Sequence, residues 1–90
     1  MEAVRGFLAR ARDDHRIGPM HISLYIVLLE RSERQDGPGF FAIYRQEVMA
    51  EAKIMGRSTY YKCMNELSDW GYIVYRPERY PGKVSKVDLK

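Results

Sequence analysis

The sequence predicts one small α+β domain, mostly helical, with a β-hairpin near its C-terminus. Four segments place apolar residues at the spacing of a helix, and two short segments after residue 71 carry the β-branched and aromatic residues or the alternation of strands. In addition, 90 residues bury a single modest core. This length excludes a two-domain enzyme and the deep pockets that form between domains.

Two helices are expected in the first third of the chain. The first carries an apolar stripe at positions i, i+3, i+4 and i+7, formed by Val4, Phe7, Leu8 and Ala11. Gly18-Pro19 interrupts this pattern, and from His21 the same spacing restarts and continues into the charged run 30–34. We therefore divide the chain into an N-terminal helical segment, 1–17, and a domain over 18–90. The stripe over 4–11 fits two interpretations, a dimerisation arm that forms a homodimer or a helix that lies on its own core.

The middle of the chain predicts a loop over 36–39, a brief strand over 40–43 and a short helix over 45–52. A tight connection over 53–56 follows, in which Gly56 is the residue able to take the positive φ that such a turn often needs. A further helix is expected from Ser58, as the N-cap residue, to about Trp70, with Gly71 as the C′ residue that ends it.

The last part predicts two strands, over 72–75 and 84–89, joined by a turn over 76–83 that holds two prolines and a glycine. Two short helices joined by a four-residue turn form a helix-turn-helix unit, and a hairpin directly after the second helix makes a winged helix. We call the helix over 58–70 the recognition helix and the segment over 76–83 the wing.

The charge is unevenly distributed along the chain. There are 15 basic and 12 acidic residues, for a net charge of +3; residues 1–44 carry six of each, and residues 45–90 carry nine basic and six acidic residues. The recognition helix is expected to turn Tyr60, Cys63, Met64 and Leu67 inward. The residues that remain facing outward are two cations and four hydrogen-bonding side chains, with no acid: Arg57, Ser58, Thr59, Tyr61, Lys62 and Asn65.

These side chains suit the edges and phosphates of a DNA duplex, whose major groove, about 12 Å wide, accepts one helix. Arg57 and Lys62 suit guanine or phosphate, and Asn65 suits adenine. The wing region adds cations and one aromatic residue for backbone or minor-groove contact, namely Arg76, Arg79, Tyr80, Lys83 and Lys86. The alternative for both segments is that they are ordinary solvated surfaces.

The segment GRSTYYKCMNELSDWGYIVYRP resembles the second helix and wing of MarR- and GntR-type winged-helix regulators. Ser58 and Thr59 match the start of that pattern, and Gly71-Tyr72-Ile73 matches its close. Residues 21–89 are more similar to small helix-turn-helix proteins of bacterial conjugative transposons, through the stretches EVM…K, TYYKCMNEL and WGYI. Residues 1–20 lie outside this resemblance.

We therefore expect sequence-specific binding of double-stranded DNA by a transcription regulator or an accessory factor of a mobile element. The alternative is a winged helix that serves as a protein–protein module in a replication or DNA-transfer complex. A third interpretation, RNA binding by the same basic face, stays open.

Other functions are not expected. A single cysteine, Cys63, excludes an intramolecular disulfide framework, and without a secretory signal or a membrane span the sequence predicts a cytoplasmic protein. Neither His15 nor His21 has a Cys, Asp or Glu partner at metal-ligand spacing in the sequence, so no metal or other cofactor is expected. No nucleophile–base pair is visible, and we expect no enzyme activity.

Overall fold

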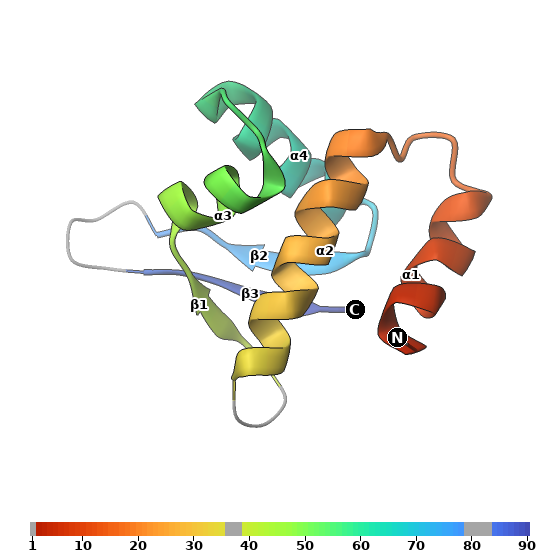
Figure 1. Cartoon of the computed structure of the whole chain (residues 1–90), viewed down its shortest axis with the longest axis horizontal. Coiled ribbons are helices and arrows are strands. Elements are labelled where there is room, and N and C mark those ends of the chain that lie inside the picture. Colours follow the sequence, from red (N-terminus) through yellow and green to blue (C-terminus); the bar gives the residue numbers. More distant parts are fainter. Residues whose placement is uncertain (1, 36–38, 79–83) are drawn as a thin grey trace.

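The computed structural model describes residues 2–35, 39–78 and 84–90. Its four helices are α1 (Glu2–Arg12), α2 (Pro19–Arg34), α3 (Arg45–Ala52) and α4 (Arg57–Asp69), and its three strands are β1 (Phe41–Ile43), β2 (Ile73–Arg76) and β3 (Ser85–Leu89). The predicted α+β class, mostly helical, is confirmed, and so is the predicted order of the elements (Figure 1).

The strands form one antiparallel sheet in the order β1-β3-β2. The predicted hairpin is β2 with β3, in a register that places Tyr75 opposite Val87. On its other side β3 pairs with β1, so that Phe41 also lies opposite Val87. Because side chains alternate along a strand, these three residues share the face of the sheet that packs against the helices. Val87, at the centre of that face, is fully buried.

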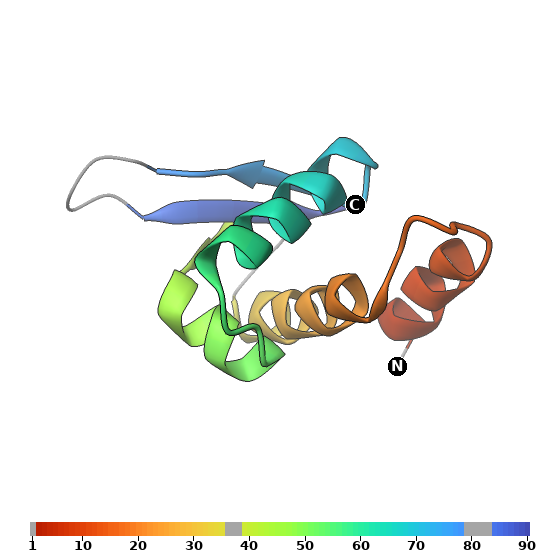
Figure 2. The same cartoon turned by 90° about the horizontal axis from the view of Figure 1, so that it is seen from above.

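Helix α2 is the central element of the core. It packs against α3 and α4, and α4 in turn packs against β2. Figure 2 shows α2 and α3 on one side and α4 with the hairpin on the other. Where these elements meet, Leu24 and Leu28 of α2 and Met64 and Leu67 of α4 are fully buried. The orientation of α4 is therefore fixed by apolar packing on its inner face, which leaves its opposite face to solvent.

Helix α1 packs against the rest of the chain through the apolar stripe found in the sequence. Phe7 is 3% exposed, stacks on Tyr25 with ring centroids 4.0 Å apart and meets Tyr72 edge to face. Arg10 donates hydrogen bonds to the carbonyl oxygens of Gly71 and Lys90. The stripe thus packs against the chain's own core. Of its four residues, only Leu8 is more than one-third exposed. A homodimer through residues 4–11 stays a prediction.

The connection between α1 and α2 is held by polar contacts around Asp14. Its carboxylate accepts hydrogen bonds from the Arg16 guanidinium at 2.8 and 2.9 Å and from the Tyr72 hydroxyl at 2.9 Å. The Arg16 side chain also lies over the ring of Trp70. The bonds from Arg16 hold the pKa of Asp14 well below its usual value, because they stabilise the ionised form.

Two details of the α3–α4 connection differ from the prediction. Lys53, with φ 62°, takes the left-handed conformation, whereas Gly56 is extended with φ −104° and is itself the N-cap of α4. Ser58 therefore lies inside the helix. The reversal occurs directly after α3, where the Ile54 N–H bonds back to the Met49 carbonyl, so position in the turn decides which residue is left-handed. Gly71, with φ 84°, ends α4 as predicted.

Candidate functional site

The outward face of α4 is the surface that the sequence singled out. Tyr60, Cys63, Met64 and Leu67 are buried, as predicted. Of the residues predicted to face outward, Thr59 is half-buried and five are exposed, namely Arg57, Ser58, Tyr61, Lys62 and Asn65. Helical periodicity explains this division, since the buried positions recur every three or four residues along α4.

Three of the acidic residues near this face in sequence are engaged elsewhere, whereas Asp69, exposed at the end of α4, forms no ion pair with a described residue. Arg31 of α2 forms ion pairs with Glu47, at 2.8 Å, and with Glu51, both on α3. Glu66 of α4 lies 2.8 Å from His21 of α2. Among the described residues, Arg57 and Lys62 form no ion pair, so their charges remain available on the outward face.

The hairpin presents its cations in a different direction. Arg76 and Lys86 lie opposite each other in the β2–β3 register, one position along from Tyr75 and Val87. By alternation they occupy the face of the sheet away from the helices, where the Arg76 guanidinium lies 4.0 Å from the centre of the Phe40 ring. Arg76 and Lys86 thus lie on a different face of the chain from the cations of α4, and their contact with DNA stays a prediction. The predicted wing residues Arg79, Tyr80 and Lys83 lie outside the described residues.

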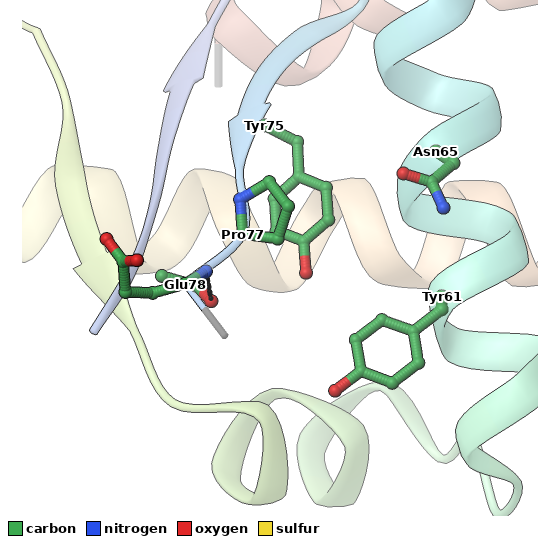
Figure 3. Close-up of a pocket in the computed structure, with 6 residues that line it drawn as sticks. Tyr61, Asn65, Tyr75, Pro77 and Glu78 are labelled. Carbon is green, nitrogen blue, oxygen red and sulfur yellow. Dashed lines mark hydrogen bonds between the residues drawn. The ribbon is translucent and has the colours of Figure 1, made fainter. Parts of the chain in front are cut away.

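A cleft of about 440 Å³ separates α4 from the hairpin, and sequence reasoning did not predict it (Figure 3). Two residues of α4 line it, Tyr61 and Asn65. The hairpin side contributes Tyr75, Pro77, Ser85 and one acidic residue, Glu78. The hydroxyl groups of the two tyrosines point into the same space (Figure 3). The Tyr75 hydroxyl, neutral at neutral pH like that of an ordinary tyrosine, can donate a hydrogen bond, and burial raises its pKa further.

A second hollow lies next to the cleft, at the start of α3. A hollow of about 300 Å³ is lined by Tyr44, Arg45 and Gln46 at that helix end and again by Tyr61 and Ser85. Tyr44 is 55% exposed. The outward face of α4, the start of α3 and the near side of the hairpin thus form one continuous surface. The start of α3 was absent from the predicted site, although the first helix of a helix-turn-helix typically crosses the DNA backbone.

A second cluster of polar side chains lies where α2 meets α4. His21 Nε2 lies 2.8 Å from Glu66 Oε1, and His21 Nδ1 accepts a hydrogen bond from the Gly18 N–H at 2.9 Å. The Cys63 sulfur lies within 4.8 Å of the ligand atoms of both His21 and Glu66. Burial raises the pKa of the Cys63 thiol. The sequence spacing around His21 did not indicate this cluster, because the three residues meet only in the folded chain.

No family model, no curated protein and no solved structure matches this chain. The resemblance to winged-helix regulators and to proteins of conjugative transposons accordingly stays a prediction. In the described part of the chain, no helix combines the length and the apolar character needed to cross a membrane.

Proposed function

We propose that this chain is a winged helix-turn-helix protein that binds double-stranded DNA sequence-specifically, as a transcription regulator or an accessory factor of a mobile element. The observation that supports this most is the outward face of α4 over residues 57–65. It is exposed, rich in hydrogen-bonding groups and free of acids, and its two cations form no ion pair among the described residues. A surface of this kind complements both phosphates and base edges.

In this proposal the first turns of α4 enter the major groove. Arg57 and Lys62 contact guanine or phosphate, and Asn65 pairs its amide with adenine. Ser58 and Thr59 bond to phosphates or bases, and the ring of Tyr61 lies on a sugar or a thymine methyl group. Because α4 is held by its buried inner face, these groups are presented on a rigid element.

The neighbouring elements flank the groove. The start of α3, with Arg45, lies beside the α4 face and suits the DNA backbone on one side. On the other side the β2–β3 hairpin acts as the wing and contacts the backbone or the minor groove. Since Arg76 and Lys86 lie on its far face, they contact DNA only where the duplex passes around the hairpin; for this reason α4 carries sequence recognition in the proposal.

The experiment that tests the proposal is selection of bound sequences from a random pool of DNA duplexes. We expect enrichment of a defined motif, palindromic if the chain acts as a dimer and a single half-site if it acts as a monomer. An RNA pool selected in parallel separates DNA binding from the RNA alternative. If the DNA pool is not enriched at low salt, the proposal fails, whatever the RNA pool shows.

A second candidate is a protein–protein module in a replication or DNA-transfer complex. It is favoured by exposed apolar side chains close to the same surface: Met55, in the turn between α3 and α4, is 95% exposed, and Tyr44 is 55% exposed. The two functions separate by mutation. If Met55→Ser abolishes the cellular function and Arg57→Ala with Lys62→Ala preserves it, the surface binds a protein.

A further inference from the structure

The cluster of His21, Cys63 and Glu66 plays no part in the proposed contact with DNA. It joins two elements that are distant in sequence, since His21 belongs to the first turn of α2, Cys63 to the middle of α4 and Glu66 to its second half. We propose that these three residues form a binding site for a transition-metal ion, best suited to Zn²⁺, that links α2 to α4. This site is independent of whether the chain binds DNA.

The positions of the ligand atoms support a shared ion. The His21 nitrogen, the Cys63 sulfur and the Glu66 oxygen all lie within 4.8 Å of one another. In a tetrahedral zinc site, with bonds of about 2.0–2.3 Å, ligand atoms lie about 3.3–3.7 Å apart. Cys63 and Glu66, three residues apart on α4, project from the same side of the helix toward His21. The separations in the structure therefore differ from those of a zinc site by about 1 Å at most.

The chemistry of the donors selects the metal. Thiolate, imidazole and carboxylate are each ligands that Zn²⁺ accepts, whereas Mg²⁺ and Ca²⁺ require oxygen ligands. The environment is sheltered, because His21 is 9% exposed and Cys63 is 4% exposed. A hollow of about 430 Å³, lined in part by Met20, Thr59 and Lys62, opens onto the cluster. It provides a route of entry and room for a water molecule as the fourth ligand.

The hydrogen bonds around His21 predict what binding changes. Because Nδ1 accepts the Gly18 N–H, the neutral ring carries its proton on Nε2 and donates it to Glu66. A metal ion takes the lone pair of Nε2, so the ring proton moves to Nδ1, and the Gly18 N–H loses its acceptor. Cys63 releases its thiol proton to solvent and binds as thiolate. With neutral His21 and ionised Glu66, each bound ion thus releases one proton.

The same contacts also have a purely structural explanation. His21 caps the start of α2 through Gly18 and bonds α2 to α4 through Glu66, and both functions are complete without a metal. The two explanations differ in one respect: only the metal site gives Cys63 a bond, since a buried thiol packed as a small apolar side chain coordinates nothing.

The test is a titration of the metal-free full chain with Co²⁺ and with Zn²⁺. We expect one equivalent of Co²⁺ to produce thiolate-to-metal charge-transfer absorption together with the visible bands of a four-coordinate site, and Zn²⁺ to abolish both. Cys63→Ser removes the charge-transfer absorption, and Glu66→Gln retains it with weaker binding. His15→Ala, at an exposed histidine, is the matched control and leaves the titration unchanged.

A second readout is amide hydrogen exchange of the Gly18 N–H, which we expect Zn²⁺ to accelerate in the wild-type chain. The proposal is overturned if Co²⁺ gives no charge-transfer absorption with the wild-type chain, or if Cys63→Ser, folded by circular dichroism, binds Zn²⁺ as tightly. The wild-type titration decides the question even if a variant fails to fold. Because no DNA is present, failure here leaves the proposed function untouched.

Discussion

Replacing Arg57 and Lys62 together by alanine is expected to reduce the salt dependence of DNA binding. Each phosphate that a cation neutralises contributes about −0.9 to the slope of log affinity against log salt concentration. Four described cations lie on α3, α4 and the turn between them without an ion pair to a described residue, namely Arg45, Lys53, Arg57 and Lys62. With one or two hairpin contacts they give a wild-type slope near −5.

Loss of two contacts raises this slope by about 1.8, to near −3. Between 50 and 200 mM salt the wild-type affinity then falls about 1,000-fold, whereas that of the Arg57→Ala/Lys62→Ala variant falls about 100-fold. Fluorescence anisotropy with a labelled duplex at several salt concentrations measures both slopes. Circular dichroism verifies that the variant is folded, as expected for two exposed positions in α4.

The matched control is Arg5→Ala with Arg12→Ala, which removes the same two positive charges from exposed positions of α1. Figure 1 shows α1 on the side of the molecule away from α3. We expect the control to keep the wild-type slope. If the control changes the slope as much as the α4 variant does, binding reflects net charge alone. If the α4 variant keeps the wild-type slope, α4 is not the contact surface and the reasoning is refuted.

Phe7→Ala is expected to lower the free energy of unfolding by about 3–5 kcal/mol, because its ring is 3% exposed in the chain's own core. Leu8→Ala, at a side chain 39% exposed, is expected to lower it by less than about 1 kcal/mol. Urea unfolding measures both variants, and equal losses of stability for Phe7→Ala and Leu8→Ala would contradict the described packing of α1. The pKa of Asp14 is lowered in the folded state, so its contribution to stability is complete above its usual pKa of 3.8 and is lost as the pH falls below that value. Asp14→Asn should therefore lose less stability than the wild type between about pH 5 and about pH 3, and equal losses in urea titrations would count against this linkage. Gly71→Ala, at φ 84° with open space around the position, is expected to lower the free energy of unfolding by about 1 kcal/mol. Gly6→Ala, within α1, is expected to raise it by about 0.5–1 kcal/mol. Thermal unfolding measures both glycine variants, and a gain at Gly71 would contradict its left-handed backbone.

The sequence predicted those parts of the fold that depend on local patterns. Helix α3 begins and ends at the predicted residues, and the β2–β3 hairpin follows from two strand-like runs around a turn. The pairing of β1 with β3 was not predicted, because no local pattern indicates which strand a short apolar run joins. The left-handed residue of the α3–α4 turn was misplaced for a related reason. Glycine adopts this conformation most readily, but the reversal directly after α3 requires it at Lys53.

For the candidate site, too, the sequence predicted what depends on a local pattern and missed what depends on contacts between elements. The outward face of α4 was predicted correctly because helical periodicity alone determines which side is buried. The cleft between Tyr61 and Tyr75 and the cluster around His21 depend on contacts between different elements, which local spacing does not reveal. The position of Arg76, on the face of the sheet away from the helices, could have been predicted from the sequence, because Arg76 follows the inward-facing Tyr75 by one residue in a strand.

The most direct test of the central claim, that α4 is the DNA-contact surface, is a titration of the ¹⁵N-labelled chain with a selected duplex, followed by NMR amide shifts. The account predicts that the largest shifts fall at residues 57–65, with further shifts at the start of α3 and along the hairpin, while α1 stays unchanged. Amide shifts confined to α1, or no shifts at saturating duplex, would contradict it.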